Sequence, residues 1–213
     1  MPPTHLAEPA ATTVPADPSA LPPAQRERRG RILAAAITLI GRSEYDAIQM
    51  RDVAAEGSVA LATIYRYFTS KEHLYAAALV EWAADFPLSR RAGARVADTD
   101  ETRVRALMRR AVRAFERHPQ MMRAVIVLES STDPNARALF EQFADQNIAA
   151  LMDALASIEP TTAAAIVETV NSVMVTRLRA WALGRCSIRE VDRSVQRALD
   201  LIFSPSPVVS AGR

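Results

Sequence analysis

The sequence predicts an all-α fold, and three features of its composition and pattern lead to that prediction. Alanine is abundant while only six of the 213 residues are glycine, a balance that favours helices over sheets. Runs of alternating valine, isoleucine and threonine, which are typical of strands, are nearly absent. Apolar residues instead recur three and four positions apart along most of the chain, which is the period of an amphipathic helix. We therefore expect nine helices.

The N-terminal region is expected to form a small domain, called the head below, behind a tail. Residues 1–23 are rich in Pro, Ala and Thr without periodicity, which predicts a disordered tail. The head follows over residues 24–70. Three helices are expected in it, over residues 25–42, 49–56 and 60–67. Thr69 and Glu72 then match a capping box that starts a fourth helix, and Pro87 ends that helix.

The fourth helix is expected to connect the head to a second domain, called the body below, over residues 71–204. Pro134 and Pro160 each stand at the start of an apolar stripe, a position that proline favours in helices. A flexible tail is expected over residues 205–213. The five helices expected in the body lie at about 104–117, 121–128, 134–155, 160–184 and 187–203.

Composition narrows the class of protein further. A hydrophobic content of 49% and a charged content of 23% are ordinary for a globular protein, and a net charge of +2 is too small to indicate a partner. The single cysteine, Cys186, rules out an internal disulfide and favours a reducing compartment. Neither a signal peptide nor an apolar run long enough for a membrane helix is apparent. A cytoplasmic location without membrane attachment is expected.

A helix-turn-helix unit is predicted within the head. Gly57 stops the short second helix, and residues 58–59 form a tight link to the third. In the third helix Ile64 and Phe68 stand four residues apart and point the same way, which predicts that both are anchored in the core of the head. That helix would enter the major groove of DNA. Its residues expected to face the nucleic acid are Tyr65, Arg66 and Tyr67.

Basic residues around this unit predict contacts with DNA phosphates. Arg28 and Arg29 lie in the stretch "QRERRGR" at the start of the first helix, where phosphate or minor-groove contact is favoured over a merely soluble helix start. Lys71 falls in the first turn of the fourth helix, where the helix dipole disfavours a cation. A phosphate outside the chain would complete that site, and a solvated lysine is the alternative. Arg66 can donate to guanine or to a phosphate.

The remaining contacts follow from position in the two helices of the unit. Gln49 and Arg51, at the start of the second helix, are expected to hold the DNA backbone. At the start of the third helix, Ala60 and Leu61 can contact thymine methyl groups. Thr63 can serve either a base or a phosphate.

A ligand cavity is predicted in the body, whose helices carry methionine and phenylalanine on their inward faces. Such stripes are usually plain core, but methionine-rich surfaces suit adaptable binding sites, and clefts between bundle helices commonly hold ligands. Asn147 and Asn171 can orient a carbonyl or hydroxyl group, or can belong to the core or to a dimer contact. The residues expected to line the cavity are Phe86, Met108, Phe115, Met121, Met122, Val125, Phe140, Phe143, Asn147, Asn171 and Met174.

Two further surfaces of the body are considered. Arginines opposite the apolar stripe of residues 104–117 are explained by a solvated face, with a rim for an anionic effector such as a CoA thioester as the alternative. The last two helices carry more apolar positions than one bundle contact uses, which predicts a twofold dimer. The residues expected at its interface are Val173, Leu178, Trp181, Val191, Val195 and Leu199.

An enzyme is not expected. The three histidines are isolated, and no Gly-x-Ser-x-Gly elbow, phosphate-binding glycine loop or His/Cys metal spacing occurs. No cofactor or metal is therefore predicted. The alternative to a DNA-binding regulator is a helical protein that binds a small molecule and has weak or no specific DNA binding.

A family resemblance adds to these predictions. The segments "ERRGRILAAAITLI", "AIQMRDVA" and "VALATIYRYFTSKEHL" resemble the DNA-binding domain of TetR-type repressors, over about residues 25–86. Together with "LRAWALGRCS" they are similar to the actinobacterial repressors that control cholesterol and steroid catabolism. Ala60, Ala62 and Gln49 depart from the residues that this family often carries there. The resemblance implies a nine-helix homodimer that binds palindromic double-stranded operator DNA and is released by a small apolar effector, steroid-derived or of the acyl-CoA type.

Overall fold

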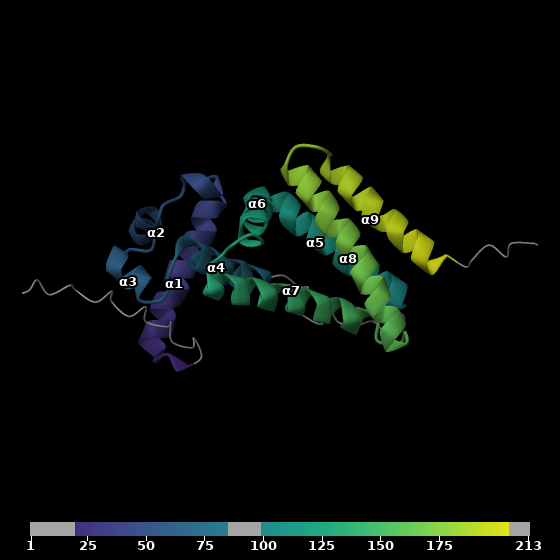
Figure 1. Ribbon diagram of the computed structural model, residues 1–213, viewed down its shortest axis with the longest axis horizontal. Coiled ribbons are helices and arrows are strands. Elements are labelled where there is room, and N and C mark those ends of the chain that lie inside the picture. The colour runs from purple at the N-terminus through teal and green to yellow at the C-terminus, as the bar shows by residue number, and fades with distance from the viewer. Residues whose placement is uncertain (1–19, 85–98, 205–213) are drawn as a thin grey trace, which may run out of the picture.

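The computed structural model describes residues 20–84 and 99–204, and within these ranges the chain forms nine α-helices, one 3-10 turn and no strand. The all-α prediction is thereby confirmed. The elements are α1 (Pro23–Ile40), η2 (Tyr45–Ala47), α2 (Met50–Glu56), α3 (Leu61–Tyr65), α4 (Lys71–Ala84), α5 (Asp100–Arg117), α6 (Pro119–Leu128), α7 (Pro134–Ala154), α8 (Pro160–Ala182) and α9 (Ile188–Phe203). The head lies at one end of the molecule and α8 and α9 lie at the other (Figure 1).

The first helix begins earlier than the sequence suggested. Pro23 takes the first-turn position that proline favours, two residues ahead of the expected start. Leu21 before it is buried in the head, and its carbonyl accepts a hydrogen bond from the Arg26 guanidinium at 3.0 Å. The expected tail over residues 1–23 is therefore too long at its C-terminal end, while its first 19 residues and the tail over 205–213 lie outside the described residues.

The start of α4 is capped by a different residue from the one predicted. Ser70, not Thr69, precedes the helix, and its hydroxyl oxygen accepts a hydrogen bond from the backbone N–H of His73 at 2.9 Å. This bond satisfies one of the free N–H groups of the first turn, which is the role of a helix cap. The cap therefore lies one position later in the chain than predicted. Thr69 makes tertiary contacts instead.

The central helix α4 belongs to both parts of the molecule. It packs against α1 in the head and against α7 in the body. Its apolar side chains are buried on nearly every side, from Leu74 and Tyr75 at its start to Trp82 near its end. A helix that is apolar on nearly every side is enclosed by its neighbours, and α4 is enclosed by both the head and the body.

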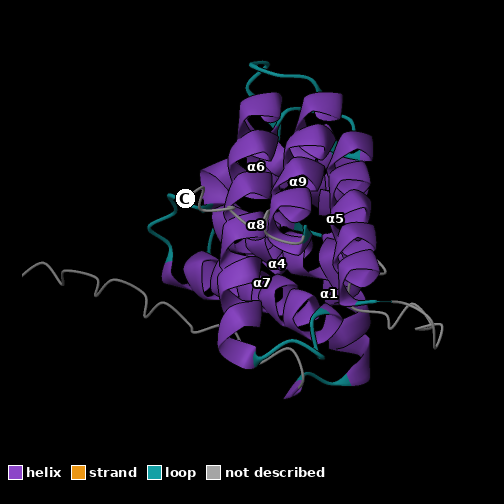
Figure 2. Cartoon of the chain, turned by 90° about the vertical axis from the view of Figure 1, so that its right-hand side faces the viewer, coloured by secondary structure: helices purple, strands orange, loops and turns teal. Residues whose placement is uncertain are grey.

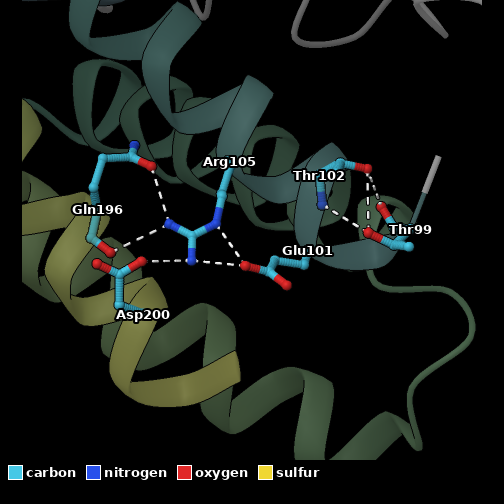
Figure 3. Close-up of polar contacts among 6 residues, drawn as sticks. All are labelled: Thr99, Glu101, Thr102, Arg105, Gln196 and Asp200. Atoms are coloured by element: carbon cyan, nitrogen blue, oxygen red, sulfur yellow. Dashed lines mark hydrogen bonds and ion pairs between the residues drawn. The ribbon is translucent and has the colours of Figure 1, made fainter. Parts of the chain in front are cut away.

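The body is a bundle in which α9 packs against both α8 and α5 (Figure 2). Arg105 of α5 stabilises the contact between α5 and α9. Its guanidinium donates to the Asp200 carboxylate at 2.8 Å and to the Gln196 side chain at 3.2 Å, and its Nε donates to the Glu101 carboxylate within α5 (Figure 3). One face of α9 is thus bound within its own chain. Over residues 20–84 and 99–204, no helix combines the length and the apolar character that a membrane crossing requires.

Candidate nucleic-acid interface and effector cavity

The recognition helix α3 is anchored as predicted. Ile64 and Phe68 are completely buried, whereas Tyr65 is 51% exposed and Arg66 is exposed. The anchors pack into the core that α1, α2 and α4 form around them. The phenol ring of Tyr65 therefore projects from the outer surface of the head, where a nucleic acid can reach it.

Tyr67 does not face outward, and this part of the prediction is wrong. Only 8% of the residue is exposed, and its ring lies beside that of Phe68, with the centroids 6.4 Å apart. α3 ends at Tyr65, and in the turn that follows the backbone N–H of Tyr67 bonds to the Ile64 carbonyl at 2.9 Å. Tyr67 stands three residues after the buried Ile64, and residues three apart in a helical turn lie on the same face, so Tyr67 faces the core together with Ile64 and Phe68.

The other residues predicted at the start of α2 and α3 are accessible to different degrees. Gln49 and Arg51 are exposed. The backbone N–H of Gln49 donates to the Asp52 carboxylate at 2.8 Å, and this bond caps the N-terminus of α2. Ala60 is exposed and Leu61 is 40% exposed, while Thr63 is half-buried. These residues belong to the same helix-turn-helix unit as Tyr65, and their contacts with DNA stay a prediction.

Of the two arginines of α1 that were predicted to contact DNA, Arg29 is partly used by the head itself. The guanidinium of Arg29 lies 5.3 Å from the centroid of the Phe68 ring, a cation–π geometry. Burial lowers the pKa of Arg29, and the nearby carboxylate of Glu81 opposes that shift. Arg28 is half-buried. Arg29 therefore helps to cover the anchor of the recognition helix.

Lys71 also has a partner inside the head. Its ammonium group donates to the backbone carbonyl of Tyr45 at 2.5 Å and lies 4.2 Å from the centroid of the Tyr45 ring. Burial lowers the pKa of Lys71, whereas nearby carboxylates, Asp46 first, raise it. An ammonium group has three N–H donors, so contact with a phosphate would have to use those that the Tyr45 carbonyl leaves.

The body contains a cavity of about 400 Å³, which lies among α4, α5, α6, α7 and α8. Its walls are mainly apolar, as in pockets that hold small apolar molecules. Nine of the eleven residues predicted to line a cavity do so. They are Met108, Phe115, Met122, Val125, Phe140, Phe143, Asn147, Asn171 and Met174.

Two residues of the predicted set are not found in the cavity wall. Phe86 lies outside the described residues. Met121 is buried but does not line the cavity, because consecutive residues of a helix point about 100° apart. With Met122 and Val125 turned toward the cavity, Met121 of the same helix packs elsewhere in the core.

Sequence reasoning missed several groups that line the cavity. Trp82 of α4 does so, and it was not among the residues predicted to line the cavity. Glu129 brings a carboxylate to the wall and forms an ion pair with Arg179 of α8, a pairing between residues fifty positions apart that no local pattern signals. Among the described residues, no group of His, Cys, Asp or Glu side chains is placed to hold a metal ion.

The polar groups of the cavity are few. The side-chain amide of Asn147 donates to the Phe143 carbonyl at 2.8 Å, which leaves its oxygen as an acceptor for a ligand. Asn171 also lines the cavity and is half-buried. An apolar molecule with one or two polar groups would suit this wall.

The predicted dimer interface needs correction. Leu178, Val191, Val195 and Leu199 are at most 1% exposed in the single chain, so they cannot contact a second copy. These side chains form the core between α9 and its neighbours α5 and α8. The two other residues of the set, Val173 and Trp181, are only partly buried. The large apolar side chain that α9 leaves outside is Leu201, which is 84% exposed.

Known proteins share both the head and the body. The family described as bacterial regulatory proteins, tetR family, matches residues 32–78, and the tetracyclin repressor-like, C-terminal domain matches residues 97–202. The HTH-type transcriptional repressor KstR of Rhodococcus jostii (strain RHA1) is 32% identical over 187 residues, which cover 84% of this chain and 84% of the relative.

Solved structures agree in fold. A TetR transcriptional regulator from Rhodococcus sp. RHA1 has a TM-score of 0.73 at 24% identity, over 86% of this chain and all of that one. Thermus thermophilus FadR, a TetR family repressor in complex with lauroyl-CoA, has a TM-score of 0.66 at 19% identity, over 87% and 98% of the two chains. The resemblance noted in the sequence is therefore confirmed, and this chain belongs to the tetR family of bacterial regulatory proteins.

Proposed function

We propose that this protein is a homodimeric repressor that binds palindromic operator DNA and leaves it when a small apolar effector fills the cavity. One observation carries the proposal: α4 starts beside the recognition unit, and near its other end Trp82 and Ala83 line the cavity. The DNA-facing surface and the ligand site are thus two ends of one buried helix. Such a regulator acts in the cytoplasm, where its operator lies.

The proposed mechanism is a shift between two conformations of the dimer. An effector changes operator affinity only if it binds one conformation better than the other. A molecule that enters the cavity contacts α4 through Trp82 and Ala83 and contacts α7 through Phe140 and Phe143. A small displacement of α4 changes the separation of the two recognition helices, which has to be about 34–36 Å to match one turn of DNA.

The effector is proposed to be a small apolar molecule with a carbonyl or hydroxyl group. The apolar wall supplies the binding energy, at about 25 cal/mol per Å² of apolar surface removed from water, and Asn147 and Asn171 can bind the polar group. The lauroyl-CoA in the FadR structure supports an acyl-CoA. The similarity to KstR, together with the resemblance to repressors of steroid catabolism, supports a steroid-derived compound.

The dimer is proposed to form through the outer faces of α8 and α9. Leu201, with its side chain almost fully in water, and the partly buried Trp181 supply apolar surface there. Leu201→Arg is expected to give monomers by light scattering, and the matched control Leu183→Arg, at a 52% exposed position after α8, is expected to stay dimeric. Dimers of both variants would exclude this face.

A mobility-shift titration tests the repressor itself. A duplex selected from random sequence is expected to bind specifically, with an affinity that falls steeply as salt rises. Lauroyl-CoA and a steroid ketone such as progesterone are then added separately to the complex. Release by either compound supports the proposal, and Ala111→Trp, which places a bulky ring in the cavity wall, is expected to block that release while DNA binding continues.

Two results would contradict the proposed function. If a compound binds the protein by calorimetry and operator affinity does not change, effector control is excluded. If no specific duplex emerges while an apolar compound still binds, the protein is the helical ligand-binding protein of the alternative prediction.

A further inference from the structure

A cluster of hydrogen bonds joins the end of the recognition unit to the start of α7. One carboxylate oxygen of Asp133 accepts from the hydroxyl groups of Thr69 at 3.2 Å and Ser70 at 2.5 Å, which lie 64 and 63 residues away in sequence. Its other oxygen accepts from the backbone N–H groups of Asn135 at 2.8 Å and Ala136 at 3.1 Å. A single side chain thus caps α7 and holds the head.

Thr69 is fixed from several directions. The amide of the Asn135 side chain donates to the Thr69 hydroxyl oxygen at 3.2 Å, and the backbone N–H of Thr69 donates to Nδ1 of His73 at 3.2 Å. Thr69 directly follows Phe68, the completely buried anchor of the recognition helix. Because each residue has only two soft backbone torsions, holding Thr69 fixes how α3 is set relative to α7.

Electrostatics strengthen this contact. Burial alone would raise the pKa of Asp133, but hydrogen bonds from Ser70, from the backbone of Ala136 and Asn135 and from Thr69 bring it below its usual range. The carboxylate is therefore ionised at neutral pH. Hydrogen bonds to an ionised acceptor are about twice as strong as those between neutral groups.

The same helix also forms a wall of the cavity. Phe140, Phe143 and Asn147 of α7 line it, two to four turns beyond Asp133. A helix that is hydrogen-bonded throughout moves largely as one body. The first turn of α7 and its cavity wall are therefore mechanically connected.

We propose that Asp133 is a positioning residue: through Thr69 and Ser70 it sets the angle of the head on the body, and so the spacing of the two recognition helices in the dimer. This inference rests on the proposed function, since it requires a dimer on a two-part operator. Asp133 touches no DNA in this role. It selects which half-site spacing the dimer binds, and it passes a displacement of the cavity wall to the head.

A second link between head and body provides a matched control. Arg123 of α6 forms an ion pair with Glu44 of the head at 2.7 Å, but the two side chains are 46% and 68% exposed. Exposed ion pairs of this kind contribute little. Arg123→Gln therefore breaks a contact across the same boundary without removing a buried bond.

The test compares operators that differ only in the spacing of their half-sites. Asp133→Ser keeps a good cap for α7, but its shorter side chain does not reach Thr69 and Ser70. Asp133→Asn keeps the length, and its amide can donate to the same hydroxyl oxygens. Affinities of the full-length dimers are measured for the selected operator, for an operator with one added base pair between half-sites, and for an isolated half-site.

In the wild type, the added base pair is expected to weaken binding by about tenfold or more, since it rotates one half-site by about a tenth of a turn. In Asp133→Ser this penalty is expected to fall to about threefold or less, with half-site affinity unchanged. Arg123→Gln is expected to behave like the wild type, and Asp133→Asn, which keeps the length of the side chain but not its charge, is expected to lie between them. If the added base pair weakens binding of Asp133→Ser as much as it weakens binding of the wild type, the inference is overturned. The inference is also overturned if the penalty falls in Arg123→Gln as much as in Asp133→Ser. A wild type that binds no duplex would instead contradict the proposed function.

Discussion

Two tyrosines that stand two residues apart allow the proposed DNA surface to be tested with a matched pair of variants. Tyr65 is 51% exposed on the recognition helix, whereas Tyr67 is 8% exposed and packs beside Phe68. Tyr65→Phe and Tyr67→Phe each remove one hydroxyl group and nothing else. Because Ile64 and Phe68 anchor the helix in both variants, neither change is expected to disturb the fold of the head.

The magnitude follows from the chemistry of a phosphate contact. A hydrogen bond to a charged group contributes about 1.5–3 kcal/mol, so Tyr65→Phe is expected to weaken operator binding by roughly 10- to 150-fold per contact. Tyr67→Phe is expected to keep the wild-type affinity, since its side chain belongs to the core. Fluorescence anisotropy with a labelled operator at several salt concentrations measures both.

The salt dependence adds an internal check. A tyrosine carries no charge, so Tyr65→Phe is expected to lower affinity at every salt concentration without changing the slope of log K against log salt. Lys71→Gln removes a cation, and it is expected to reduce that slope by about one for each head if the ammonium contacts a phosphate. Equal operator affinities for the Tyr65 and Tyr67 variants would refute the assignment of the outer face. An unchanged slope for Lys71→Gln would show that its ammonium group does not contact a phosphate.

Three further predictions concern stability. Phe68→Ala is expected to lower the free energy of unfolding by about 3–5 kcal/mol, because it leaves a cavity in the head, and denaturant titration checks this. Burial lowers the pKa of His73, with Asp133 opposing and Arg29 adding to the shift, and its Nδ1 accepts a hydrogen bond from Thr69. The unfolded chain therefore takes up a proton that the folded chain resists, so stability is expected to fall as pH drops below about 6.5, and the fall should be smaller in His73→Gln. Arg105→Met is expected to speed amide hydrogen exchange in the last turns of α9, because it removes the contacts with Gln196 and Asp200.

Local pattern was enough to place the helices and the anchors of the recognition unit. Apolar residues at helical spacing located all nine helices within the described ranges to within a few residues. Ile64 and Phe68 were identified from their four-residue spacing alone, because side chains that far apart in a helix point the same way. The methionine and phenylalanine residues of the cavity wall were found for a similar reason, since such side chains on the inward faces mark where the helices meet.

Other features depended on contacts that no local pattern contains. Apolar periodicity shows that Val191, Val195 and Leu199 are covered, but it does not show whether a second copy or another helix of the same chain covers them, and here α5 and α8 do. Tyr67 is covered by the core of the head and packs beside Phe68, a contact that the expected outward Tyr-Arg-Tyr run did not include.

The sequence by itself therefore determined the helices, the family and the exposed tyrosine of the recognition helix, since each depends on residues close together in the chain. Only the tertiary structure decided which apolar faces are left for a partner, and only it brought Asp133 to Thr69 and Ser70. The physical reason is that a hydrogen bond or a packed face between distant segments exists only once the chain has brought them together.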